Sequence, residues 1–197
     1  MVGDRFIERT VTKMVQSANR RGARLTGVLR SDYTGQECAL AAALEVLGER
    51  WTLLIVRDAF FGVRRFSDFV VRLDIPRAVL TDRLRGLVDH GVMAQVEDPD
   101  RPGRHVYELT PAGKELWPAL HALISWGSEH RRRSTRKYEH AACGTELAPG
   151  GLCPSCGVVP GPEDVVTASR APGQEIRTDA ISVAMRAPRR LLEPIAP

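Results

Sequence analysis

The 197-residue sequence has few cysteines, few aromatic residues and no long apolar run. Its apolar stretches fall short of roughly 18 consecutive residues, the length that a membrane-spanning helix needs, so we exclude a membrane bundle and expect no membrane partner. Because no charged, then apolar, then small-residue leader opens the chain, we expect a cytoplasmic protein whose thiols stay reduced. Four cysteines in that setting favour metal or redox chemistry over structural disulfides.

The sequence also lacks the short motifs of common enzyme classes. It has no nucleophile elbow, phosphate-binding loop or HExxH helix, so we do not expect an enzyme. The net charge of +4 is modest, but residues 64–85 contain six arginines against three aspartates. A local positive stretch of this kind could contact a polyanion.

The pattern over residues 38–73 predicts three helices. The first carries leucines on one face and ends at Gly48, and the second, residues 51–61, is apolar almost all round and therefore belongs in a core. Ser67 is a candidate N-cap for a short third helix that runs to about Leu73.

A fourth helix is predicted to begin at Pro76, because the fixed φ of proline suits the first helical turn. Two short helices separated by a tight turn, the second with a leucine stripe and arginines, are what a helix-turn-helix requires. Residues 92–96 and 105–109 are typical of two strands around a basic turn. A last helix is expected from Pro111 to His130, capped by the preceding threonine.

This order of elements predicts a winged helix-turn-helix over residues 36–130, a mainly α fold with a small β-hairpin. The last helix carries more apolar surface than one small core needs, which favours a homodimer. A two-fold dimer would present its second helices about one DNA turn apart.

Four stretches of the sequence carry a family resemblance. They are Leu44–Phe69 (LEVLGERWTLLIVRDAFFGVRRFSDF), Leu80–Met93 (LTDRLRGLVDHGVM), Tyr107–Leu116 (YELTPAGKEL) and the pair Trp126 and Gly127. Over residues 37–128 the chain resembles the HxlR family of bacterial winged-helix transcription regulators. The resemblance implies a homodimer formed through the first and last helices of the domain and a pseudo-palindromic double-stranded DNA operator.

The resemblance also implies roles for two segments: Pro76–His90 as the recognition helix and residues 97–105 as the wing. Members usually have proline, glycine and serine where this chain has Ala39, Asp74 and Pro76. The operator sequence therefore does not carry over.

Two groups of side chains are candidate DNA contacts. Those that lie off the leucine stripe of the recognition helix could face bases, and they are Arg77, Thr81, Asp82 and Arg85. Those on the preceding helix start and on the wing suit phosphates, and they are Arg65, Ser67, Arg101, Arg104 and His105. Each of them could instead be solvated surface, and Arg83 could pair with Asp68 or Asp58.

A second signal, HAACGTELAPGGLCPSCG, lies outside the family resemblance. It contains two pairs of candidate metal ligands, each pair separated by two residues: His140 with Cys143, and Cys153 with Cys156. Tetrahedral Zn2+ takes four such ligands, and a glycine after each second cysteine allows the tight turn. The pattern predicts a small structural Cys3His zinc ribbon. The alternatives are a redox pair in CPSC or ordinary thiols, although no thioredoxin-like context surrounds CPSC.

Cys38 stands ahead of the first core helix, where family members carry a cysteine that senses oxidants or electrophiles in several cases. A helix N-terminus favours the thiolate, so Cys38 could switch the regulator in response to an oxidant. The competing interpretation, slightly favoured, is a half-buried cysteine packed at a helix start. A small-molecule or oxidant effector is possible in either case.

The remaining segments flank this domain. Residues 1–35 are expected to be an extension with an amphipathic helix at 6–18, either docked on the body or acting as a basic arm on DNA phosphates. Residues 131–160 combine a basic helix end, solvated or in contact with phosphate, with the zinc ribbon. Residues 161–197 are proline-rich and predicted to be a mostly flexible, mobile tail, with a turn or two of helix at 178–186.

We therefore expect a sequence-specific DNA-binding transcriptional regulator. Two other classes of function stay open on the sequence alone. One is a protein-interaction module built on a winged helix, and the other is a redox enzyme that uses CPSC.

Overall fold

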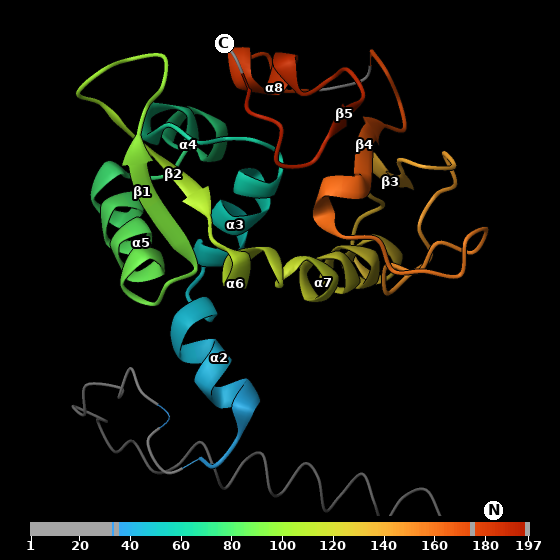
Figure 1. Ribbon diagram of the computed structural model, residues 1–197, viewed down its shortest axis with the longest axis horizontal. Coiled ribbons are helices and arrows are strands. Elements are labelled where there is room, and N and C mark those ends of the chain that lie inside the picture. The colour runs from blue at the N-terminus through green and yellow to red at the C-terminus, as the bar shows by residue number, and fades with distance from the viewer. Residues whose placement is uncertain (1–32, 34–35, 174–175, 196–197) are drawn as a thin grey trace, which may run out of the picture. The chain divides into compact units, whose positions relative to one another are not determined.

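The computed structural model of the chain describes residues 33, 36–173 and 176–195 (Figure 1). The chain divides into two compact units, residues 1–36 and 37–197, and the helices and strands described here belong to the second. The helix predicted at residues 6–18 lies outside the described residues.

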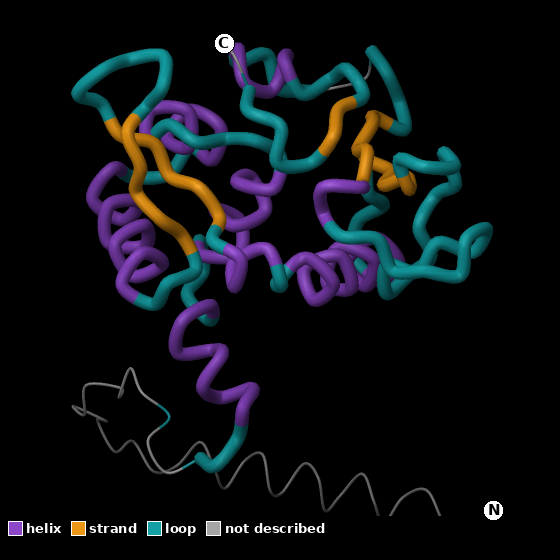
Figure 2. Tube along the Cα trace, viewed as in Figure 1, coloured by secondary structure: helices purple, strands orange, loops and turns teal. Residues whose placement is uncertain are grey.

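The predicted order of elements is confirmed. Figure 2 shows helices, then a two-stranded hairpin, then further helices along the chain. The elements of this part are α2 (Ala39–Leu47), α3 (Thr52–Phe60), α4 (Phe66–Leu73), α5 (Arg77–Asp89), β1 (Met93–Glu97), β2 (His105–Leu109), α6 (Pro111–Lys114) and α7 (Trp117–His130). Strands β1 and β2 pair antiparallel, with Met93 opposite Leu109 and Glu97 opposite His105. The fold is mainly helical with small β-sheets, as a winged helix requires.

The core is centred on α3, which Figure 1 shows between α4 and α7. Ile55, Val56 and Phe60 are fully buried, so the prediction that this largely apolar helix lies in the core is confirmed. The leucine stripe of α5 also faces inward, and burial of each such side chain contributes about 1.5–3 kcal/mol to folding. The opposite face of α5 is thereby held toward solvent.

Helix α4 starts two residues earlier than predicted, and α5 starts one residue later. Ser67 is not the N-cap of α4: the helix begins at Phe66, and the backbone carbonyl of Arg65 accepts the first helical hydrogen bonds. Phe66 packs against the core, which draws it into the first turn. Helix α5 begins after Pro76, which is its N-cap and donates no hydrogen bond.

The last predicted helix is interrupted. Thr110 caps α6 as expected, because its Oγ1 accepts a hydrogen bond from the Gly113 backbone N–H at 3.1 Å. The helix then stops after Lys114 and α7 starts at Trp117. Pro118 explains the break, because it cannot donate to the carbonyl four residues earlier and its ring would clash there.

Beyond α7 a second sheet forms, with strand order β3 (Arg136–His140), β4 (Val165–Ser169) and β5 (Arg189–Arg190), all antiparallel. A short 3-10 turn, Pro162–Asp164, precedes β4, and α8 (Ala180–Ala184) follows it. The helical turns expected at 178–186 are therefore present.

The prediction of a mostly flexible tail is wrong for the described residues after 160. Val165, Ile181 and Leu191 are buried in the same core as the winged helix. The backbone N–H groups of Leu192 and Ile195 donate to carbonyls at the end of α3, at 2.7 Å and 3.0 Å. Strand β4 of the predicted tail pairs with β3 of the predicted ribbon, so the two segments share one sheet. The domain boundary predicted near residue 160 is therefore absent from the described residues.

None of the described helices is both long and apolar enough to cross a bilayer.

Candidate functional site

The exposed face of α5 carries the side chains expected to face bases. Arg77, Thr81, Asp82 and Arg85 are all exposed. The Arg77 guanidinium lies 5.1 Å from the centre of the Phe66 ring, and the Thr81 hydroxyl donates to the Arg77 carbonyl at 2.9 Å. Arg85 lies 3.9 Å from Asp82, and both side chains are about two-thirds exposed, so this pair is weak. The rigid core therefore presents two arginines on one solvent-facing side of a helix.

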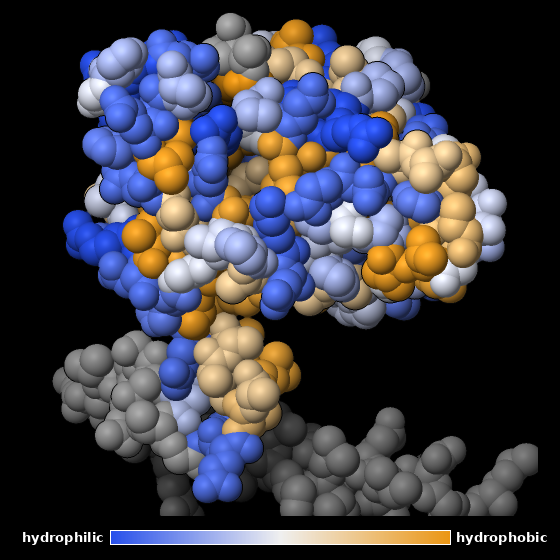
Figure 3. All heavy atoms as spheres, viewed as in Figure 1, coloured by the Kyte–Doolittle hydropathy of each residue, from blue (hydrophilic) through white to orange (hydrophobic). Residues whose placement is uncertain are grey.

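The centre of the wing is the turn of residues 98–104 between β1 and β2. Its backbone is closed by hydrogen bonds from the N–H of Asp98 to the Arg104 carbonyl, at 2.7 Å, and from the N–H of Arg101 to the Asp98 carbonyl, at 3.1 Å. Arg101, Arg104 and His105 are exposed. The surface over the wing is hydrophilic in Figure 3. The three side chains are thus available to an outside partner.

Arg65, predicted to contact phosphate, is instead held by the wing. Its Nε donates to Asp98 Oδ2 at 2.9 Å, and its Nη2 lies 3.0 Å from Asp100 Oδ2. Asp98 is only 3% exposed, and the hydrogen bond from Arg65 lowers its carboxyl pKa, while the same bond raises the pKa of Arg65. Ser67, by contrast, is exposed, and its hydroxyl donates a hydrogen bond of 3.0 Å to the Asp68 Oδ1. Arg65 positions the wing.

Other arginines of residues 64–85 are also engaged within the chain, which the sequence did not show. Arg83 pairs with Glu49 at 3.1 Å, and not with Asp68 or Asp58. Arg64 pairs with Glu108 of β2. The positive stretch of the sequence is therefore less positive in the fold, and Arg77 and Arg85 are its two exposed arginines.

Helices α2 and α7 leave apolar side chains in solvent. Leu40 is 66% exposed, and on α7 Leu123 and Trp126 are 53% and 58% exposed. The other side of α7 is buried, with Trp117 at 1%. The apolar stripe predicted on this helix is thus divided between the core and an uncovered face. Large uncovered apolar faces of this kind mark interaction surfaces.

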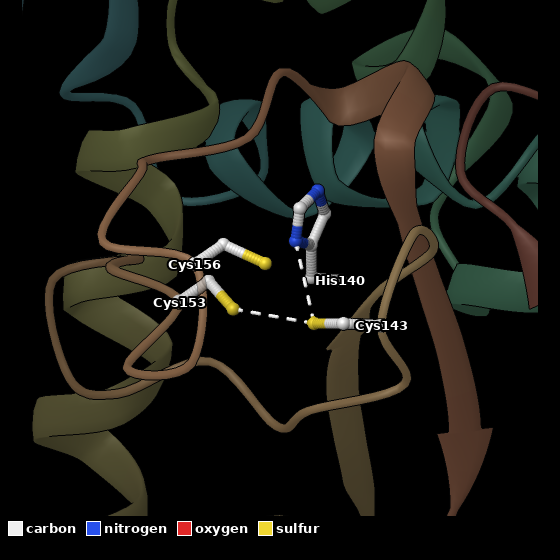
Figure 4. Close-up of side chains that lie close together, drawn as sticks. All are labelled: His140, Cys143, Cys153 and Cys156. Carbon is white, nitrogen blue, oxygen red and sulfur yellow. Dashed lines mark hydrogen bonds between the residues drawn. The ribbon is translucent and has the colours of Figure 1, made fainter.

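Four candidate ligands converge at the ribbon (Figure 4). One ligand atom from each of His140, Cys143, Cys153 and Cys156 lies within 4.8 Å of all the others. The first pair leaves the end of β3, and the second lies in a turn closed by the hydrogen bond from the Gly157 N–H to the Cys153 carbonyl at 2.9 Å. The side chains point toward a common centre in Figure 4.

The spacing of these atoms suits a tetrahedral ion. Sulfur atoms of a tetrahedral zinc site lie about 3.8 Å apart when each bond is about 2.3 Å long. The Cys143 Sγ lies 3.5 Å from the Cys153 Sγ and 3.5 Å from the His140 Nδ1. Hydrogen bonds from Thr145 lower the pKa of Cys143 to about 6, which favours the thiolate that a metal binds. The predicted ligand set could therefore hold a metal ion.

Cys38 is the N-cap of α2 and is exposed. The expectation of a half-buried cysteine is therefore wrong for the described part of the chain, where this thiol is exposed.

The chain is similar to known regulators. The family model described as HxlR-like helix-turn-helix matches residues 46–135, so the match ends before the metal ligands. An uncharacterised HTH-type transcriptional regulator of Mycobacterium tuberculosis, Rv3095, is 45% identical over 122 residues, 60% of this chain and 77% of that protein. Another, sll1512 of Synechocystis, is 34% identical over 97 residues, 49% of this chain and 72% of that protein.

One solved structure has a similar fold and sequence. The crystal structure of PA1607, a candidate transcription factor, is 33% identical and superposes with a TM-score of 0.55, covering 66% of this chain and 93% of that one.

Proposed function

The chain belongs to the HxlR-like helix-turn-helix family and is a winged-helix transcriptional regulator, and we propose that it binds a pseudo-palindromic DNA operator as a homodimer. The observation that carries the proposal is the exposed face of α5, whose Arg77 and Arg85 stand on a helix fixed by three buried leucines. Arginines on such a helix can donate bidentately to guanine in the major groove.

The remaining candidate residues divide by role. Arg77 and Arg85, with Thr81 and Asp82 beside them, face base edges. Ser67 and the wing residues Arg101, Arg104 and His105 contact phosphates, which fixes the register of the helix but carries no sequence information. Arg65 acts indirectly, because its ion pair with Asp98 orients the wing.

The homodimer forms through α2 and α7. Their uncovered leucines and Trp126 support this interface, because aromatic side chains are typical anchors of such surfaces. A two-fold axis through this interface sets the spacing of the two α5 helices.

Zn2+ at His140, Cys143, Cys153 and Cys156 serves a structural purpose. Four protein ligands leave no open position for water, so the ion would not be catalytic. The ribbon has little core of its own, and a bound ion would supply the stability that it lacks. We propose a regulatory and non-enzymatic role, exercised in the cytoplasm, where bacterial operators lie.

A redox-responsive form of the same function rests on Cys38. Its exposed thiol at the start of a proposed dimer helix is accessible to an oxidant, and a modification there would alter the interface.

The experiment that tests the proposal is recovery of the genomic DNA fragments bound by the protein, followed by footprinting of the best one. We expect a protected site with two half-sites about one helical turn apart. Affinity for DNA without any footprint would favour the protein-interaction module instead, and a monomer in solution with no DNA affinity would refute the proposal. Reduction of a test disulfide by zinc-free protein would favour the redox enzyme.

A further inference from the structure

A cavity of about 450 Å³ lies where three parts of the chain meet. Its walls come from α3 and α4 of the helix-turn-helix, from α7, and from residues 132–138 that lead into β3. Ligand pockets in proteins commonly have volumes of about 300–1,000 Å³. The cavity is therefore large enough for a small molecule.

Its lining is strongly basic. Five arginines line it, and no aspartate or glutamate does: Arg57, Arg72, Arg132, Arg133 and Arg136. Within the described part of the chain, neither Arg132 nor Arg133 forms an ion pair. Cations gathered in a recess with low-dielectric walls attract an anion more strongly than the same charges on an open surface.

One buried carboxylate, that of Asp58, lies behind the cavity and balances the cluster only in part. Its Oδ1 accepts from Arg57, whose Nη2 lies at 2.7 Å, but its Oδ2 is 3.9 Å from the Arg72 Nε, too far for a hydrogen bond. The Arg72 Nε is buried without a hydrogen-bond partner. Burial lowers the pKa of Arg72, and the positive charges of Arg57 and Arg177 act in the same direction. The negative charge of Asp58 offsets part of this effect, but the Arg72 Nε itself has no hydrogen-bond partner.

Apolar side chains also line the cavity, and two of them are nearly buried: Phe61 is 3% and Tyr138 is 6% exposed. Phe61 stacks on Tyr138 with ring centres 6.5 Å apart, and the guanidinium groups of Arg57 and Arg136 lie 5.9 Å and 5.3 Å from the Phe61 ring. Ile124 of α7 completes this side. Hydrogen bonds from Arg136 to Thr167 and to the Met185 carbonyl, at 2.9 Å and 3.0 Å, fix its side chain in place. The wall is therefore preformed.

We propose that this cavity binds a small organic anion, a carboxylate or phosphate monoester with an apolar group, and that its occupation changes operator affinity. The effect on operator affinity rests on the proposed function. The cavity touches the helix-turn-helix, the proposed dimer helix and the strand that leads to the metal ligands, so a bound anion would bias the angle between them. A ligand can do this only if it binds the two arrangements with different affinity.

The first experiment measures binding without DNA. The full-length protein is heated in the presence of benzoate, phenyl phosphate or inorganic phosphate, with neutral benzamide and sodium chloride at matched ionic strength as controls. We expect benzoate and phenyl phosphate to raise Tm saturably and by more than benzamide or chloride does. Equal shifts from all five compounds would overturn the proposal.

The second experiment uses variants of the basic run. Arg132→Gln with Arg133→Gln removes two lining charges that are exposed. Arg131→Gln is the control, since Arg131 is exposed but does not line the cavity. We expect binding of phenyl phosphate to weaken by about tenfold or more in the double variant and to be unchanged in the control. Arg72→Gln should weaken it as well. Unchanged binding in the double variant would overturn the assignment.

The third experiment separates this inference from the proposed function. Operator affinity is measured with and without phenyl phosphate, and we expect it to change in the wild type but not in the double variant. No probe binding, together with weaker DNA binding by the double variant, would assign these arginines to the DNA backbone and overturn the proposal while leaving the regulator intact. Probe binding that leaves operator affinity unchanged would overturn its regulatory half.

Discussion

Arg65 and Asp98 lie 33 residues apart in the sequence, and the Arg65 Nε donates a hydrogen bond of 2.9 Å to the Asp98 Oδ2. The pair joins the start of α4 to the first residue of the wing turn. Two elements that we propose to contact DNA are thus fixed relative to each other.

We expect Asp98→Asn to loosen the wing, because the amide keeps the shape of the side chain but loses its charge. Amide hydrogens of residues 99–104 should exchange faster, and affinity should fall for all DNA sequences alike. Asp100→Asn is the control, since the Asp100 carboxylate is 75% exposed and its pair with Arg65 is weak. Equal exchange in wild type and Asp98→Asn would contradict this role.

The same pair sets a pH dependence. Arg65 lowers the pKa of Asp98 below its ordinary value of 3.8, so the folded chain keeps this carboxylate charged at a pH where the unfolded chain protonates it. The stabilisation from this pair is present in full above the pKa that Asp98 has in the unfolded chain. It is lost as the pH falls through the lower pKa that Asp98 has in the folded chain. We expect wing exchange to accelerate below about pH 4 in the wild type, and Asp98→Asn to lack this step.

Substitutions on α5 should change sequence preference, whereas substitutions on the wing should change affinity for all DNA sequences. Arg77→Ala or Arg85→Ala should relax the preference at one base pair by about 1–3 kcal/mol. Arg104→Ala should weaken binding to every sequence and reduce the salt slope by about 0.9. A salt-titrated gel shift measures both, with Arg190→Ala, an exposed arginine of β5, as the control. Equal binding by wild type and the three variants would refute the assignment.

We expect the purified protein to contain about one zinc per chain, and Cys153→Ser to lose it because a hydroxyl is a poor fourth ligand. Tm should fall with the metal, since β3 ends at a ligand and carries the buried Tyr138 into the core. Ser155→Ala, which lies between the two cysteines, should keep both metal and Tm. A zinc content near zero in reduced protein never exposed to chelator would contradict the site.

Glutamate at Leu40 or Trp126 should convert the dimer to a monomer, because a buried unpaired charge in an apolar interface is strongly unfavourable. Light scattering after gel filtration measures the mass. Val183→Glu is the matched control, since Val183 is 43% exposed and lies on α8, outside the proposed interface. A mass unchanged by both substitutions would place the interface elsewhere.

For the redox-responsive form, we expect diamide to lower operator affinity of the wild type and to leave Cys38→Ser unaffected. That variant keeps the ribbon cysteines, so damage to the metal centre would appear in both proteins. Equal sensitivity of the two would remove Cys38 from the mechanism.

Local patterns predicted what depends on neighbouring residues. The glycine that ends α2, the Thr110 cap and the inward stripe of α5 follow from spacing and backbone preference, and so does the convergence of the four metal ligands, because each pair spans only one turn. The break before α7 also has a local cause, Pro118 in the first turn of that helix.

What the sequence did not predict depends on distant partners. Arg65 looked like a free cation because Asp98 is far away in the chain, and the basic cavity joins residues from four separate elements. The last segment looked mobile because of its prolines, and its order comes from pairing with β3 and with the end of α3, which spacing within the segment cannot reveal.

The backbone hydrogen bonds from Leu192 and Ile195 to the end of α3 bear on how the protein can be handled. A gene fragment cut at the limit of the family match would remove Tyr138, which stacks on Phe61, and would leave the Phe60 and Gly62 carbonyls without these partners. We expect such a fragment to aggregate. A premature stop codon or proteolytic trimming at this end would have the same result. Residues 191–195 are as much a part of the folded domain as the helix that we propose reads DNA.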